Sequence, residues 1–182
     1  ATLPIGYLDG DGYPDLANYT GTRLRILHAP IHLDKLEDDV ILDALAHPIG
    51  SPRLKELVKP GNTVCIVISD VTRAWQRMSV YLPHIVKELN DAGIEDKEIR
   101  FLSALGYHRK HTPEEHAKLL GPELLRRFQI IDHDCLDKDN LVHVGTTSRG
   151  TPVIINRVAA EADRLVLTGC CTYHPWVGWG GG

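Results

Sequence analysis

The chain has 182 residues, which is long enough for one domain with a well-packed core. Its 43% hydrophobic and 24% charged content is ordinary for a globular protein, and its formal net charge of -4 argues against nucleic acid or an anionic membrane as a partner. No apolar run reaches the roughly 20 residues that a membrane span requires. The cysteines lack the spacing of a disulfide framework, which predicts reduced thiols and a cytoplasmic location.

Residues 1–33 are expected to form a β-rich lead-in with a small hairpin, before an α/β core over residues 34–182. The lead-in contains Asp9-Gly-Asp-Gly-Tyr-Pro-Asp15, whose alternating carboxylates are of the type that binds Ca²⁺. It resembles the end of the calcium loops in integrin-type propeller repeats. However, Tyr7 replaces an acidic residue of those loops, and no second copy of the loop occurs. A hairpin turn is therefore the favoured interpretation.

Apolar residues recur at helical spacing in several segments, and start or stop signals lie beside them. The pattern predicts helices over residues 34–46, 53–58, 79–92, 112–120 and 122–128, and a short helix around Ala159. Asp34 and Thr112 are the expected N-cap residues, and Gly93 and Gly121 are the expected stops.

Apolar and β-branched runs predict strands over residues 63–68, 98–105, 129–132, 141–144, 152–156 and 164–168. The strands at 141–144 and 152–156 are expected to pair as a hairpin. The other strands alternate with helices, which predicts βαβ crossovers and an α/β fold with a mostly parallel sheet. The end of the chain, residues 172–182, is rich in glycine and tryptophan and is expected to be a loop.

Polar loops follow three of the predicted strands, at residues 70–73, 107–112 and 173–182. Because ligands of parallel sheets bind beyond the carboxyl ends of the strands, these loops locate a candidate site. Asp70 suits a ribose hydroxyl, and Arg73 suits a carboxylate or a phosphate. A local ion pair between the two is an equally good explanation.

Two histidines in these loops are candidates for acid–base chemistry, because imidazole titrates near neutral pH. His108 follows the second strand, and His174 lies shortly before a glycine run that needs a functional reason for its entropic cost. An ordinary surface or core histidine is the alternative for each. Lys110 and His111 are expected to be solvated, and His116 to lie on a helix face.

Two groups of side chains contain atoms that can bind zinc, but neither has the spacing of a known zinc motif. The first is His108 with His111 and His116, and the second is Cys170 with Cys171 and His174. A zinc-binding α/β protein therefore stays as an alternative. The sequence contains neither a GxGxxG motif nor a P-loop, which excludes the two commonest nucleotide-binding motifs.

Four separated segments carry a family pattern: Val67-Ile-Ser-Asp-Val-Thr-Arg73, Ala104-Leu-Gly-Tyr-His-Arg-Lys-His-Thr112, Val144-Gly-Thr-Thr-Ser-Arg-Gly-Thr-Pro152, and His174 before a glycine run. In this order and spacing the chain resembles the N-terminal domain of the nickel-pincer lactate racemase family. The resemblance extends from about His28 to the end. Its specificity comes from the agreement of all four segments, since each alone is a weak signal.

The resemblance implies a Rossmann-like α/β domain, followed in the family by a smaller C-terminal domain across a cleft. We therefore expect residues 1–182 to be a truncated N-terminal domain without the C-terminal one. The family's cofactor is the nickel-pincer nucleotide, tethered to a lysine that would fall just beyond Gly182. Its nickel-binding histidine would lie further on. The cofactor is expected in the full-length parent and absent from this fragment, which alone should be inactive.

The resemblance also implies roles for individual residues. The two catalytic histidines fall at His108 and His174. Cofactor contacts fall at Asp70, Val71, Thr72, Arg73, Gly180, Gly181 and Gly182. Arg73 would also hold the substrate carboxylate, and Trp176 and Trp179 stand where the family commonly has phenylalanine. Their wider aromatic surface points to a substrate larger than lactate, such as a sugar acid.

The expected function is a racemase or epimerase of 2-hydroxy acids. A hydride leaves the substrate for the cofactor and returns to either face of a flat 2-oxo acid, with a histidine as acid or base on each side. The alternatives are an inactive family member that binds a nucleotide or an organic acid, and the zinc-binding protein. The expected partner is a small 2-hydroxy acid, with no nucleic acid or membrane, and homo-oligomerisation is left open.

Overall fold

A computed structural model of the protein describes residues 36–170, 172–174 and 178–180. The expected lead-in, with its hairpin and calcium-type loop, lies outside the described residues. So do Asp34, Cys171, Trp176, Gly181 and Gly182. The side chains of residues 172–174 and 178–180 also lie outside the described part.

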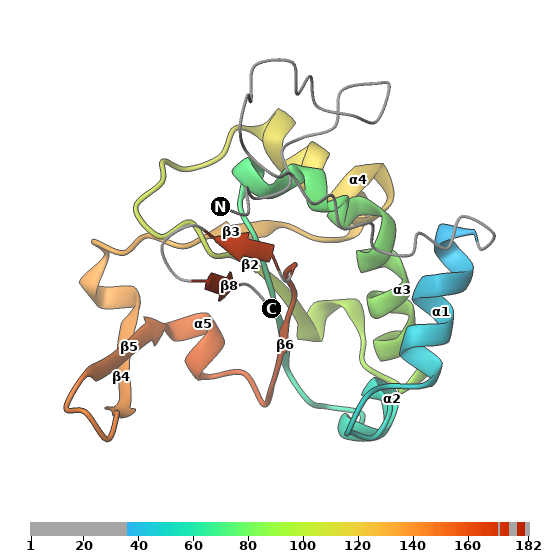
Figure 1. Ribbon diagram of the computed structural model, residues 1–182, viewed down its shortest axis with the longest axis horizontal. Helices are drawn as coiled ribbons and strands as arrows, with labels where there is room; N and C mark the ends of the chain where they lie inside the picture. The colour runs from blue at the N-terminus through green and yellow to red at the C-terminus, as the bar shows by residue number, and fades with distance from the viewer. Residues whose placement is uncertain (1–35, 171, 175–177, 181–182) are drawn as a thin grey trace, which may run out of the picture. The chain divides into compact units, whose positions relative to one another are not determined.

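The central feature is a four-stranded parallel sheet in the order β3-β2-β1-β6 (Figure 1). Its strands are β1 (Val64–Ile68), β2 (Ile99–Ser103), β3 (Ile130–Asp132) and β6 (Arg164–Leu167). In the middle of the sheet, Ile66 is in register with Phe101 on one side and with Val166 on the other. The mostly parallel sheet and the Rossmann-like α/β fold are thus confirmed.

Strand β1 lies inside the sheet and is covered on both faces, which explains its continuous apolar sequence. Alternate side chains face opposite layers. Ile66 and Phe101 belong to the larger core, which also includes the helix residues Leu82 and Leu120. Cys65 belongs to a smaller core on the other face, and burial raises the pKa of its thiol to about 11. A thiol of this kind is a packing residue rather than a nucleophile.

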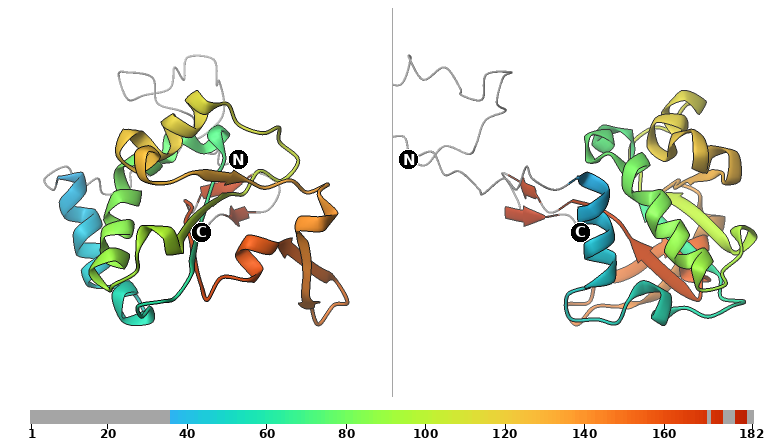
Figure 2. Two further views of the ribbon diagram at one scale, coloured as in Figure 1. Left: turned by 180° about the vertical axis from the view of Figure 1, so that it is seen from behind. Right: turned by 90° about the vertical axis from the view of Figure 1, so that its right-hand side faces the viewer.

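Helices α1 (Glu37–Ala46), α2 (Leu54–Leu57), α3 (Met78–Asp91) and α4 (Pro113–Arg127) lie on one side of the sheet (Figure 2). The N-cap predicted at Thr112 is confirmed and is part of a capping box, because Thr112 accepts from the N–H of Glu115 and Glu115 accepts from that of Thr112. The predicted stop at Gly121 is a kink with φ of 75°. Among the described helices, none is long and apolar enough to cross a membrane.

The other side of the sheet carries α5 (Arg157–Ala160) and the predicted hairpin. The hairpin consists of antiparallel β4 (Leu141–Thr146) and β5 (Pro152–Asn156). The described residues also form three short 3₁₀-helices, η1 (Val71–Gln76), η2 (Asp96–Glu98) and η3 (Lys138–Asn140).

Two expectations about secondary structure are wrong. Helix α1 begins at Glu37, with Leu36 as its N-cap residue, and not after a cap at Asp34. The three acidic residues of its first turn favour this later start through the helix dipole. The segment expected to be a loop forms antiparallel strands β7 (Thr172–His174) and β8 (Gly178–Gly180).

Candidate functional site

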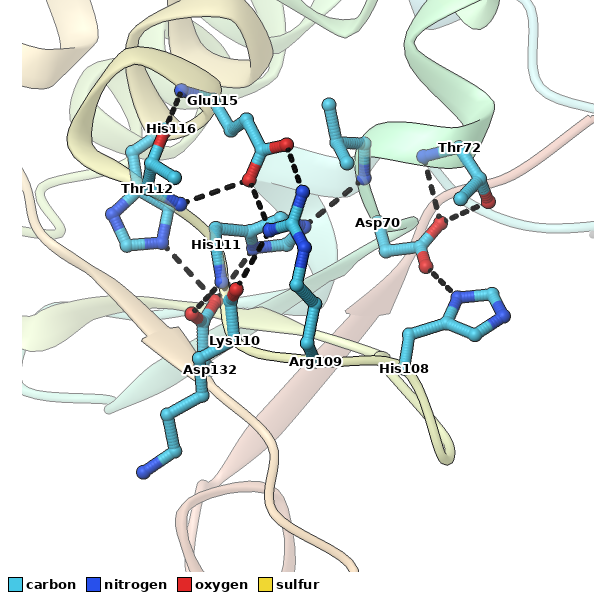
Figure 3. A network of polar contacts seen from close by, with 11 residues as sticks. Asp70, Thr72, His108, Arg109, Lys110, His111, Thr112, Glu115, His116 and Asp132 are labelled. Carbon is cyan, nitrogen blue, oxygen red and sulfur yellow. Dashed lines mark hydrogen bonds and ion pairs between the residues drawn. The ribbon is translucent and has the colours of Figure 1, made fainter.

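The carboxyl ends of β1, β2 and β3 bring polar side chains together, as expected for a parallel sheet. Asp70 follows β1, the loop 104–112 follows β2, and Asp132 ends β3. Figure 3 shows that these residues form one network of polar contacts. The site is therefore built from segments that are far apart in the sequence and adjacent in the sheet.

Asp70 holds His108. Its side chain is buried and caps η1, where Oδ1 accepts hydrogen bonds from the Thr72 backbone N–H at 3.1 Å and the Thr72 hydroxyl at 2.5 Å. The other oxygen, Oδ2, accepts a hydrogen bond from Nδ1–H of His108. A neutral His108 with its proton on Nδ1 carries a lone pair on Nε2, which is the form of a general base.

The Asp70 carboxyl is held in its charged form. Burial raises the pKa of this carboxyl, but the hydrogen bonds from His108 and Thr72 and the attraction of His108 outweigh burial and bring the pKa below its ordinary value. A charged Asp70 fixes the Nδ1–H form of His108 and would stabilise the imidazolium that forms when His108 takes a proton.

His108 is itself accessible, with 58% of its side chain exposed. It borders a surface hollow of about 180 Å³. The lining residues come from the loops after β2 and β3: Gly106, Tyr107, His108, Arg109, Lys110, His133, Asp134, Cys135 and Leu136. The site thus places the accessible His108 imidazole beside a hollow whose charged lining groups are Arg109, Lys110 and Asp134.

His111 is buried, which contradicts the expectation that it is solvated. Its side chain is only 1% exposed, and both ring nitrogens have protein partners. Nδ1 lies 2.7 Å from Oδ1 of Asp132, and Nε2 lies 3.0 Å from the backbone nitrogen of Val71. His116, on α4 as expected, places Nε2 3.1 Å from the same Asp132 oxygen. The sequence signal for this cluster was the carboxylate at the end of the third predicted strand.

Two anchors fix the loop that carries His108. Arg109 donates to both Glu115 oxygens at 2.7 Å, and these hydrogen bonds lower the pKa of Glu115 to about 2. Asp132 accepts from the His111 backbone N–H at 2.8 Å. Burial raises the pKa of Asp132, but its bonds from His111 and His116 outweigh burial and leave the pKa below its ordinary value. His108 is therefore presented from a loop that is tied to α4 and β3.

The zinc alternative finds little support in this geometry. Among the described residues, His111, His116 and Asp132 are the group whose potential metal ligands converge, all within 4.8 Å of one another. His108 belongs instead to Asp70. The Val71 N–H can only donate, so Nε2 of His111 holds the lone pair and Nδ1, the atom that faces the cluster, holds the proton. A metal on Nδ1 would move that proton to Nε2 and break the bond to Val71.

The remaining predicted site residues are only partly brought together. Arg73 is exposed beside Asp70, and its guanidinium donates to the Thr72 hydroxyl at 3.2 Å. His174 lies in β7, opposite Gly178 of β8, and Trp179 and Gly180 lie in β8. The relation of the His174 and Trp179 side chains to His108 lies outside the described part and stays a prediction, as do the contacts of Trp176, Gly181 and Gly182.

A comparison with known protein families identifies the family of this chain. Residues 16–182 match the lactate racemase N-terminal domain. The chain belongs to this family. This chain is 33% identical over 168 residues to the lactate racemase of Lactiplantibacillus plantarum, and the alignment covers 92% of this chain and 39% of that protein. The chain is also 32% identical over 146 residues to the lactate racemase of Thermoanaerobacterium thermosaccharolyticum. That alignment covers 80% of this chain and 34% of that protein.

Solved structures agree with this assignment. This chain aligns with the lactate racemase apoprotein of Thermoanaerobacterium thermosaccharolyticum with a TM-score of 0.71 and 32% identity, over 79% of this chain and 34% of that one. A Thermotoga maritima protein, with a TM-score of 0.61 and 24% identity, shares the fold. The chain thus spans less than two fifths of the length of the lactate racemases that it matches.

Proposed function

We propose that this domain contributes the acid–base residues of a racemase or epimerase of small 2-hydroxy acids. The observation that carries the proposal is the Asp70–His108 pair beside an open hollow, in a chain of the lactate racemase family. Interconversion of two mirror-image hydroxy acids requires a base that removes the hydroxyl proton and returns it. The accessible His108, with Nε2 unprotonated, is suited to that task.

We propose that this chain supplies part of the binding site for the family's nickel-pincer nucleotide. Arg73 is exposed and has guanidinium N–H groups beyond the one that contacts Thr72, so it can bind an anionic nucleotide or a substrate carboxylate. We propose that residues 70–73 and the glycines at 180–182 hold the cofactor. When bound, the cofactor supplies the acceptor for the Cα hydrogen as hydride.

The protein's own residues carry the proton and the orientation. His108 takes the hydroxyl proton as the Cα hydrogen leaves, and the charged Asp70 stabilises the resulting imidazolium. Arg73 holds the carboxylate through two parallel hydrogen bonds, so that the flat 2-oxo acid stays in place while its carbonyl reorients. We assign His174 the corresponding role on the opposite face, and we assign Trp176 and Trp179 to a substrate wider than lactate, such as a sugar acid.

The test uses the full-length, cofactor-loaded enzyme and single enantiomers of lactate and of sugar acids, followed by chiral analysis of the product. His108→Ala and His174→Ala should each lower kcat by at least about 100-fold. His143→Ala is the matched control, because His143 is an exposed histidine on β4, away from the carboxyl ends of the parallel sheet. Unchanged turnover in both site variants would contradict the proposal. A loaded enzyme that inverts no 2-hydroxy acid would contradict it as well.

A further inference from the structure

The side chain of His111 is buried, and its hydrogen bonds define its tautomer. Its side chain is 1% exposed, and the Val71 backbone N–H lies 3.0 Å from its Nε2. Because a backbone amide can only donate, Nε2 must hold a lone pair. The proton of the neutral ring is then on Nδ1, which donates to Asp132 at 2.7 Å. The ring therefore exists as the Nδ1–H tautomer, with one nitrogen donating and the other accepting.

Asp132 fixes the orientation of this ring. One carboxylate oxygen accepts from the ring, and the other accepts from the backbone N–H of His111 at 2.8 Å. His116 adds a contact at 3.1 Å to the first oxygen from α4. The Asp132 side chain is 10% exposed, so water has little access to replace these bonds. His111 is thus held by its backbone and by its side chain at the same time.

The group at the other end of His111 is the peptide bond between Asp70 and Val71. Its N–H donates to His111, and its carbonyl, that of Asp70, accepts from the Arg73 N–H at 2.9 Å. This peptide plane sets the direction in which the Asp70 side chain leaves the backbone. The loop after β2 therefore forms two hydrogen bonds with the start of η1, one from Val71 to His111 and one between His108 and Asp70 (Figure 3).

We propose that His111 is a positioning residue for the Asp70–His108 pair, acting through its Nε2 lone pair on the Val71 N–H. This inference rests on the proposed function, because its consequence is the correct placement of the acid–base histidine. Loss of the Nε2 acceptor leaves a buried N–H without a partner, and the Asp70–Val71 peptide must rotate or shift to find one. A displacement of the order of 1 Å at a reacting group is enough to slow catalysis about 100-fold.

Two substitutions separate the two nitrogens of His111. In His111→Gln the longer amide side chain can place an oxygen where Nε2 lies, so it can still accept from Val71. In His111→Asn the shorter amide can donate to Asp132 in place of Nδ1, but it does not reach Val71. The proposal predicts that Gln retains kcat within about threefold and that Asn lowers kcat on the order of 10- to 100-fold, with KM changed much less.

The kinetics are measured on the full-length, cofactor-loaded enzyme. A merely structural role through the Asp132 contact predicts the reverse order, with Asn at least as active as Gln. That order, or equal kcat for the two variants, would overturn the proposal. A large increase in KM at constant kcat would overturn it too, because the effect would then lie in substrate binding.

A spectroscopic measurement keeps the proposal testable without activity. Nitrogen-15 NMR of the histidine-labelled full-length protein should show an imidazole with Nδ1 protonated and Nε2 bare, which disappears in both variants. The Val71 amide resonance should move strongly in His111→Asn and weakly in His111→Gln. A protonated Nε2, or equal movement of Val71 in both variants, contradicts the proposal. If instead the tautomer is as expected and the enzyme inverts no hydroxy acid, the proposed function fails while the placement of His111 stands.

Discussion

Asp70 and His108 leave the carboxyl ends of two adjacent parallel strands and meet in a carboxylate–imidazole hydrogen bond. The pairing of Ile68 with Ser103 at the ends of β1 and β2 brings the two following loops to the same edge. Because Asp70 is buried and His108 is exposed, the carboxylate is shielded while the imidazole reaches the hollow. The pair thus consists of an orienting carboxylate behind an accessible base, and the first prediction depends on this arrangement.

Asp70→Asn should strongly reduce turnover without unfolding the domain. The Asn amide is of the same size and can accept from Thr72 while its NH₂ group donates to Nδ1 of His108. His108 would then carry its proton on Nε2 and could not act as a base. We expect kcat of the full-length, loaded enzyme to fall on the order of 100- to 10,000-fold. Circular dichroism should show a folded protein, and a kcat within threefold of wild type would contradict the role assigned to Asp70.

Asp132 should make the stability of the domain depend on acidic pH. Its pKa in the folded protein lies below the ordinary value of 3.8, so it stabilises the fold above that value and loses this effect as pH falls through the folded pKa. At pH 7, Asp132→Asn should lower the free energy of unfolding by about 2 kcal/mol, through loss of hydrogen bonds to a charged group. Urea unfolding at a series of pH values should show this difference shrinking below about pH 4. A constant difference down to pH 3 would rule out the charge as its cause.

The sequence predicted those parts of the fold that depend on neighbouring residues. The predicted N-cap Thr112 contacts Glu115 within one turn, and the buried strand β1 can be recognised because each of its residues is apolar. The sequence also shows polar residues directly after the predicted strands, and these polar loops located Asp70 and His108. These features need no knowledge of the rest of the chain.

The parts that the sequence missed depend on distant residues or on atypical composition. The burial of His111 requires Asp132, 21 residues later, and Val71, 40 residues earlier, and neither contact is visible in the local pattern. The strands β7 and β8 pair Thr172 with Gly180 and His174 with Gly178. Glycine has a low β propensity because it lacks a side chain to pack, so this composition indicates a loop unless the pairing is known.

The ion pair between Arg53 and Glu88 should be worth more than the exposed ion pairs. Arg53 donates to both Glu88 oxygens at 3.0 and 3.1 Å, and the Glu88 side chain is only 10% exposed. Arg53→Met should cost about 2 kcal/mol in urea unfolding, below the 3–5 kcal/mol of a fully buried pair because Arg53 is 33% exposed. Lys87→Met, in the exposed pair with Asp91, should cost less than about 0.5 kcal/mol. Equal losses in the two variants would show that burial of Glu88 adds nothing.

Gly93 and Gly61 share a φ of +87° but differ in their surroundings, which separates backbone strain from steric contact. A Cβ at Gly93 would lie 2.8 Å from Cγ of Pro60, whereas a Cβ at Gly61 would have nothing within 4 Å. Gly61→Ala should cost about 1–2 kcal/mol for the left-handed conformation alone. Gly93→Ala should cost about 1–3 kcal/mol more, because the Pro60 ring belongs to the turn before β1 and has little freedom to move. Urea unfolding of both variants measures the difference. Equal losses of unfolding free energy would mean that the Pro60 turn moves aside without destabilising the fold.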